Sequence, residues 1–248
     1  MIASIKYGSK AIKVDLSKPL DISIPVKPGG RGISAWYLDP ASISPHSEEN
    51  FTGSVKKGAP VNFNTIHFNP HAHVTHTECV GHITEEFYSV NKNLHTYFFM
   101  AELITVAPEK QGGDFVISKK QLHYALGKKK RDALVIRTLP NTDDKLNREY
   151  SHTNPPYLLE EAIIYLREKG IEHLLIDLPS VDKEKDDGRL LAHRAFWNLE
   201  GGIRLNATIT EFIFVENAIE DGTFLLNLQV APFENDASPS RPLLYQIL

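Results

Sequence analysis

Alternating apolar and polar positions at the start of the chain predict β structure. Residues 2–12 alternate loosely on either side of Tyr7 and Gly8, which is the pattern of a hairpin that turns at these two residues. Proline and glycine then become frequent over residues 39–60, and we expect this segment to be an exposed excursion. Long loops of this kind often cover a functional site or a neighbouring subunit.

Continuous apolar runs and one helical repeat organise the rest of the chain. The repeat places Leu159, Ile163 and Leu166 on one face of a helix expected from about residue 156 to residue 169. The expected strands cover residues 61–68, 97–106, 133–137, 174–177, 207–215, 223–230 and 243–248, with short helices at residues 118–126 and 191–198. No internal repeat or low-complexity linker divides the chain. We therefore expect a single α+β (mixed α/β) domain over residues 1–248, with a mixed β-sheet core and flanking helices.

Composition and charge are those of an ordinary globular protein. The chain is 42% hydrophobic and 23% charged, with a net charge of −4. This charge implies no general attraction to nucleic acid or to an anionic membrane, so neither is an expected partner. The single cysteine excludes an internal disulfide and fits a reducing compartment. No signal-peptide pattern and no apolar run of about eighteen residues is present, and a cytoplasmic protein is the expectation.

Histidine is concentrated in one short stretch. Five of the eleven histidines lie within the sixteen residues from His67 to His82, and Glu78 and the only cysteine, Cys79, lie in the same run. Imidazole and carboxylate together form the ligand set of zinc, manganese or iron. The stretch therefore indicates a metal site. The alternative interpretation is a polar surface loop with separate hydrogen-bonding histidines.

The phase of an extended backbone divides these histidines. Successive side chains of a strand point to opposite faces, which places His76, Glu78 and His82 on one face. His71 and His73 are out of phase with them, so a bulge or tight turn would have to bring one of the two round. Such a set supplies two or three ligands and leaves a histidine that could act as general base.

Two residues far from this stretch are candidates to complete the site. His193 follows the strand expected at residues 174–177, and Glu211 is a lone carboxylate inside an otherwise apolar strand. A carboxylate in that position faces solvent, points into a site or destabilises the strand. We therefore treat both residues as possible metal ligands.

The histidine stretch also resembles a family signature. The kynurenine formamidase and cyclase family of metal-dependent hydrolases carries the motif His-x-Gly-Thr-His-x-Asp-x-Pro-x-His, and THTECVGH at residues 75–82 is similar to its second half. Other segments are similar to the family in the same order along the chain. They are DLSKPL at residues 15–20, IDLPSVD at 176–182, AHR at 192–194, ATITEFIFV at 207–215, FLLNLQVAP at 224–232 and SPSRP at 238–242.

This resemblance implies a fold and a reaction. The fold would be the swivelling β/β/α type, and the reaction would be hydrolysis of an amide, N-formyl amide, lactam or lactone bond by a metal-activated water. The substrate would be a small molecule, and Trp36 and Tyr37 are candidates to line its pocket. The family also implies a homodimer or a homotetramer.

The resemblance further implies roles for individual residues. His76, Glu78, His193 and Glu211 would be metal ligands, and His82 would be the general base. The cofactor would be a divalent transition metal, zinc in the first place and manganese in the second, with one ion or two.

Some positions depart from the family signature. Glu78 replaces the aspartate of the motif and is one methylene longer, and the position of the first histidine is occupied by Ala72. A shift of one residue would restore either His71 or His73 as a ligand, and we favour His71. These departures leave two alternative functions, a metal-dependent lyase or cyclase at the same site and a metal-binding homologue without activity.

Overall fold

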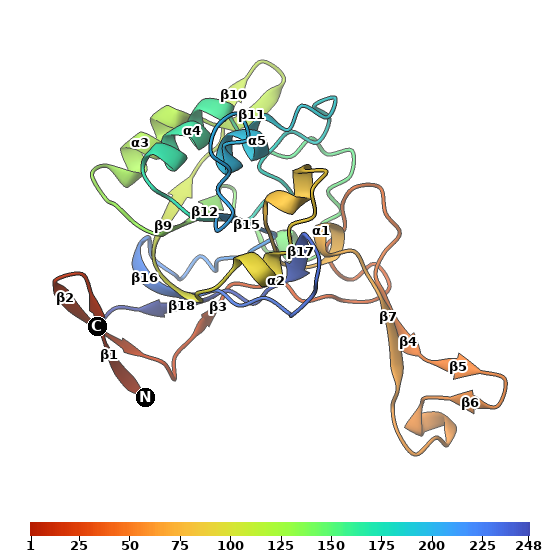
Figure 1. Ribbon diagram of the computed structural model, residues 1–248. Coiled ribbons are helices and arrows are strands. Elements are labelled where there is room, and N and C mark those ends of the chain that lie inside the picture. Colours follow the sequence, from red (N-terminus) through yellow and green to blue (C-terminus); the bar gives the residue numbers. More distant parts are fainter.

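A nine-stranded mixed sheet forms the centre of the computed structural model, which describes residues 1–248 (Figure 1). The strand order is β17-β8-β15-β14-β12-β9-β16-β18-β3. The four strands β9, β12, β14 and β15 are parallel to one another, and the strands on both sides of them are antiparallel. The bounds are Leu20–Asp21 (β3), His76–Glu78 (β8), Phe98–Val106 (β9), Ala133–Thr138 (β12), His173–Ile176 (β14), Thr208–Glu211 (β15), Gly222–Asn227 (β16), Ala237–Pro239 (β17) and Leu243–Gln246 (β18).

Three helices cover one face of the sheet (Figure 1). On β12, Leu134 and Ile136 belong to the core beneath these helices, whereas Ala133 and Val135 belong to the core on the other face with Leu226 of β16. Burial on both faces explains why this strand is continuously apolar. The helices are α3 (Lys119–Leu126), α4 (Glu160–Glu168) and α5 (Leu191–Trp197). The expected mixed sheet with flanking helices is confirmed.

Two β structures project from this body (Figure 1). The expected N-terminal hairpin is confirmed as β1 (Ile2–Tyr7) and β2 (Lys10–Asp15). The expected excursion is a long arm in which β4 (Ser42–Pro45) pairs with β7 (Asn64–His67). The tip of the arm holds β5 (Ser47–Glu48), β6 (Phe51–Thr52) and the 3-10 turn η1 (Val55–Lys57).

Short elements connect the larger ones. They are α1 (Pro70–His73), η2 (Val80–Ile83), α2 (Val90–Asn93), β10 (Glu109–Gln111), β11 (Asp114–Ile117), η3 (Asp143–Leu146) and β13 (Tyr157–Leu158). No helix in the chain combines the length and the apolar character needed to cross a membrane.

Two boundaries differ most from the expectation. Helix α4 begins at Glu160 and not near residue 156, because Tyr157 and Leu158 pair with β11 as strand β13. The strand expected to continue to residue 215 ends at Glu211, because Phe212 adopts a left-handed conformation with φ of 55°. Both differences come from pairing or backbone geometry that an apolar pattern does not record.

Candidate metal centre

The centre of the site is a buried pair on two neighbouring strands. Strand β8 pairs antiparallel with β15, and His76 lies directly opposite Glu211 in this register. Nε2 of His76 is 3.4 Å from Oε2 of Glu211, and both side chains are buried. Paired strands are rigid supports, so these two groups are held in a fixed geometry.

Glu78, at the end of β8, contacts three more histidines. Its Oε2 is 3.3 Å from Nδ1 of His71 and 3.8 Å from Nε2 of His82, and its Oε1 is 3.1 Å from Nε2 of His193. His193 is also 3.9 Å from Oε1 of Glu211. The structure therefore brings six of the proposed residues together in one cluster: His71, His76, Glu78, His82, His193 and Glu211.

The route by which His71 and His82 reach this cluster differs from the prediction. No bulge precedes His76. Instead, Pro70 at the first position of α1 and the side chain of Asn69, which accepts a hydrogen bond from the His71 backbone N–H, fix a helical turn that presents His71. His82 does not lie on the extended strand, because β8 ends at Glu78.

The 3-10 turn η2 carries His82. Gly81 precedes it at a close approach of the backbone, where a Cβ atom would lie 2.1 Å from the carbonyl oxygen of Tyr88. Any other residue at this position would push the turn away from Tyr88. The turn that holds the ring of His82 in place therefore requires glycine at position 81.

His73, the alternative to His71, lies outside the cluster. It is buried, and its Nδ1 accepts a hydrogen bond from the backbone N–H of Asn69 at 2.9 Å. It belongs to none of the groups of side chains whose donor atoms could hold an ion. The structure thus brings His71 and not His73 to the site.

Each remaining ring nitrogen faces a hydrogen-bond acceptor. Nδ1 of His193 donates to Asp182 at 2.6 Å, and Nδ1 of His76 donates to the carbonyl of Val74 at 3.1 Å. Asp236 accepts from both His71 and His82. Acceptors of this kind fix the ring orientation and the protonated nitrogen of metal-binding histidines.

Sequence reasoning assigned no role to Asp182 or Asp236. Asp182 closes the IDLPSVD segment, and Asp236 stands two residues before the SPSRP segment, so both lie beside positions that resemble the family. This proximity was the available signal. The contacts of Asp236 depend on the pairing of β17 with β8, whereas Asp182 meets His193 across the loop that leads into α5.

The donor atoms of the cluster fit a metal ion. Nε2 of His76 and Oε2 of Glu78 are buried and have no hydrogen-bond partner, an arrangement that is costly unless a cation contacts them. Three groups have donor atoms within 4.8 Å of one another: His71 with His76 and Glu78, Glu78 with His82 and His193, and His71 with His82 and Asp236. Imidazole and carboxylate donors match zinc and manganese.

The pKa values of the charged groups in the cluster also indicate a metal site. Burial opposes protonation of His71, but the hydrogen bond to Asp236 and the nearby carboxylate of Glu78 prevail and raise its pKa to about 10. Burial would raise the pKa of Glu78, yet the charge of His82, the hydrogen bond of His193 and the proximity of His71 hold it well below the usual range. The carboxylates of Asp236 and Glu78 thus favour the protonated form of His71. A bound metal ion would displace this proton.

A cavity of about 350 Å³ opens beside the cluster. Trp36 and Leu38 line it together with Leu190, and Asn69 and Ser180 add polar groups. Trp36 has a left-handed backbone with φ of 60°, and its Nε1 donates to the carbonyl of His71 at 2.9 Å. This strained conformation turns an aromatic ring towards the site. Tyr37 does not line the cavity; its hydroxyl donates instead to Glu184, which does.

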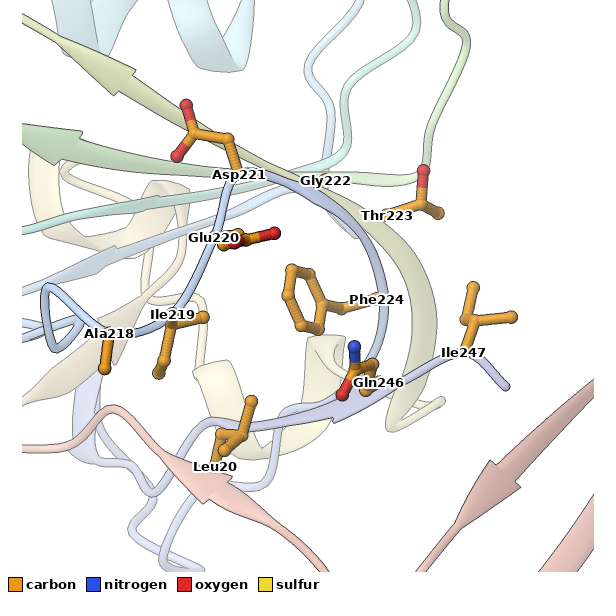
Figure 2. Close-up of a pocket in the computed structure, with 10 residues that line it drawn as sticks. All are labelled: Leu20, Ala218, Ile219, Glu220, Asp221, Gly222, Thr223, Phe224, Gln246 and Ile247. Carbon is orange, nitrogen blue, oxygen red and sulfur yellow. The ribbon is translucent and has the colours of Figure 1, made fainter.

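A larger cavity lies elsewhere in the chain. It has about 520 Å³ and is formed at β16, β18 and β3, where Phe224, Ile219 and Leu20 surround an open space (Figure 2). Asp221 points away from this space in Figure 2 and accepts hydrogen bonds from Thr105. No histidine or cysteine lines this cavity. The smaller cavity is therefore the candidate reaction site.

Known proteins are similar to this chain in sequence and in fold. The family described as "Putative cyclase" matches residues 14–183. A kynurenine formamidase of Bacillus cytotoxicus is 26% identical over 233 residues, which are 93% of this chain and 96% of that protein. An isatin hydrolase A of Labrenzia aggregata superposes with a TM-score of 0.67 at 15% identity, over 92% of this chain and 93% of its own.

A further solved structure, described as a potential metal-dependent hydrolase with cyclase activity, gives a TM-score of 0.64 at 17% identity and covers 92% of this chain and 97% of that one. Such structural matches show the fold. The family match spans well over half of the chain. The chain therefore belongs to the cyclase family, and the resemblance noted in the sequence is confirmed.

Proposed function

We propose that the protein is a metal-dependent hydrolase that cleaves a carbon–nitrogen bond of an amide or N-formyl amide, with zinc as the ion. The observation that carries this proposal is the pair of unpartnered buried atoms, Nε2 of His76 and Oε2 of Glu78, beside a cavity with an aromatic wall. The kynurenine formamidase and isatin hydrolases among the similar proteins support the bond type.

The donor atoms support one ion or two. His71 and His76 group with Glu78 on one side, where Nδ1 of His71 is 3.3 Å from Oε2, and His193 faces Oε1 of the same carboxylate on the other. Glu211 spans the same two sides, with Oε2 near His76 and Oε1 near His193. These residues would be able to hold an ion on either side, one or two in all.

The chain itself supplies the base. A bound divalent metal lowers the pKa of water and polarises a carbonyl. His82 donates its Nδ1 hydrogen to Asp236, which leaves Nε2 free to take a proton at the edge of the cavity. Trp36, Leu38 and Leu190 would hold an aryl or other apolar part of the substrate and exclude water from it.

The test is turnover of a panel of substrates by the zinc-loaded protein. N-formylkynurenine, isatin and simple lactones would be incubated with the wild type and with His82→Ala, and the products analysed by mass spectrometry. We expect at least one compound to gain the elements of water, and His82→Ala to be strongly impaired. Products that have lost water or closed a ring would favour a lyase or cyclase. No turnover of any compound by the metal-loaded wild type would refute the hydrolase.

We further propose that the protein is a homo-oligomer joined through the arm. The arm projects from the body (Figure 1) and exposes large apolar side chains, with Phe63 at 56%, Val55 at 53% and Ile66 at 53% of their surface. A projection with such a surface is stabilised when a second copy covers it.

The free, buried thiol of Cys79 supports a cytoplasmic location, where reducing conditions preserve thiols.

A further inference from the structure

We propose that Asp236 is a shared positioning residue that couples a metal ligand, His71, to the general base, His82. The proposal rests on the function proposed above and adds a residue to it. Although Asp236 belongs to one of the three donor groups, its Oδ2 is engaged by two ring N–H groups, so it would contact neither substrate nor metal. It would act by fixing the orientation and the protonated nitrogen of two rings at once.

One oxygen of Asp236 serves both histidines. Its Oδ2 is 2.9 Å from Nε2 of His71 and 3.2 Å from Nδ1 of His82. The two rings stack with centroids 4.3 Å apart and an angle of 28° between their planes. A single acceptor therefore binds opposite nitrogens of two stacked rings.

This arrangement decides which nitrogens face the metal site. A carboxylate only accepts, so each histidine places an N–H on Asp236 and turns its other nitrogen inward. The inward atoms are Nδ1 of His71 and Nε2 of His82, which lie 3.3 Å and 3.8 Å from Oε2 of Glu78. The contact to Asp236 thus points a ligand nitrogen and a base nitrogen at the same place.

The backbone holds Asp236 firmly in this position. Its carbonyl accepts a hydrogen bond from the N–H of Cys79 at 3.0 Å, and the next residue, Ala237, is paired with Glu78 in the register of β17 and β8. Asp236 is therefore anchored to the strand that carries Glu78. The backbone position of Asp236 is fixed by the edge of the sheet.

Asp182 provides a matched comparison within the same site. It accepts from Nδ1 of His193 at 2.6 Å, and from the backbone N–H groups of Ala192 and His193. Asp182 thus supports a proposed ligand and makes no contact with His82. Loss of its charge should weaken metal binding without disturbing the ring of His82, whereas loss of Asp236 should affect both His71 and His82.

The experiment compares Asp236→Ala, Asp236→Asn and Asp182→Asn in the full chain. Zinc affinity is measured by competition with a chelator, and kcat and KM are measured at saturating zinc. For Asp236→Ala we expect zinc affinity to fall about 10- to 100-fold, kcat to fall at least about tenfold even when zinc is saturating, and KM to stay near the wild-type value. Asp182→Asn should lose zinc affinity while the ring of His82 keeps its hydrogen bond to Asp236.

Asp236→Asn guards against a folding defect, because it keeps the shape and one acceptor oxygen while removing the charge. It should fold, as judged by its thermal transition, and should show smaller losses than Asp236→Ala in both quantities. If Asp236→Ala does not fold, the zinc affinity and kcat of Asp236→Asn test the proposal. Wild-type zinc affinity, or a wild-type kcat at saturating zinc, in a folded Asp236 variant would overturn the proposal.

A spectroscopic readout separates this proposal from the proposed function. In the zinc-loaded protein, the ring N–H of His82 bonded to Asp236 should give a protected proton resonance that is absent from both His82→Ala and Asp236→Ala. Its presence with no turnover of any substrate would refute the hydrolase and retain the contact. Its survival in Asp236→Ala would refute the shared contact, whatever the activity.

Discussion

His76 and Glu211 face each other across two antiparallel strands, with Nε2 of one 3.4 Å from Oε2 of the other. The strand that contains Glu211 is also parallel to β14, so this pair joins the histidine stretch to the parallel half of the sheet. A lone carboxylate in an apolar strand would be destabilising there without a cationic partner. The register of β8 and β15 thus provides both the position of the site and the reason for the carboxylate.

Replacement of His82 tests its role as a base. His82 is 30% exposed and lines the cavity, whereas His76 is fully buried. We expect His82→Ala to retain the metal and to lose about 10²- to 10⁴-fold in kcat, the usual contribution of a positioned general base. Elemental analysis and steady-state kinetics measure the two quantities. A variant that loses its metal as well would make His82 a ligand.

Protonation of His173 should contribute to the pH dependence of the free energy of unfolding. Burial, together with the charge of Arg204, lowers the pKa of His173 to about 4. The unfolded chain binds a proton near pH 6.5, so stability is present above that pH and is lost as the pH falls towards 4. Between pH 7 and pH 5 this loss amounts to about 2 kcal/mol.

Urea unfolding of the wild type and of His173→Gln at pH 7 and pH 5 measures this term. The difference in unfolding free energy between the two pH values should be smaller in the variant by about 2 kcal/mol. Other titrating groups are common to both proteins and cancel in the comparison. Equal differences in the two proteins would show that His173 titrates normally.

A buried ion pair anchors the ends of two central strands. Nζ of Lys145 is 2.8 Å from Oδ2 of Asp177, which also accepts from the backbone N–H of Thr138 at 2.8 Å. Lys145→Met leaves Asp177 buried without its partner, and we expect a loss of about 3–5 kcal/mol in the free energy of unfolding. The double variant with Asp177→Asn removes both charges and should be less destabilised than the single variant. A single variant as stable as the wild type would contradict this.

The arm can be tested by its effect on oligomeric state. A charge at either of two exposed apolar positions of the arm, Phe63→Glu or Ile66→Glu, should disrupt packing against a second copy. We expect both variants to be monomers by size-exclusion chromatography with light scattering. Their thermal unfolding transition should match that of the wild type. Thr52→Glu, on the same arm, is a control for added charge. A monomeric wild type would contradict the proposal directly.

Local signals in the sequence were sufficient for much of the fold. Ser118 and Gln121 form the capping box of α3 through contacts three residues apart, and the turn after Tyr7 closes its hairpin within a few residues. Continuous apolar runs located the central strands. These features depend on neighbours in the chain, so sequence patterns record them.

The geometry of the site depends on contacts that such patterns do not record. The opposition of His76 and Glu211 follows from strand register, and the position of His82 follows from the contact of Gly81 with Tyr88. Asp236 reaches its histidines only because β17 pairs with β8 at the edge of the sheet. The residue types were thus sufficient to predict candidates for the site. Their positions relative to one another follow from strand pairing, which the sequence pattern does not record.

Metal dependence of the reaction is tested by titrating metal back into chelated protein while following hydrolysis of N-formylkynurenine. We expect no activity in the chelated protein and a rise with added zinc that reaches its plateau at one or two equivalents. His76→Ala and Glu211→Gln should bind less zinc and remain inactive, and His67→Ala, on the exposed arm, should match the wild type. Hydrolysis that persists without metal would show that the reaction is not metal-dependent. Zinc binding unchanged by His76→Ala would show that His76 is not a ligand.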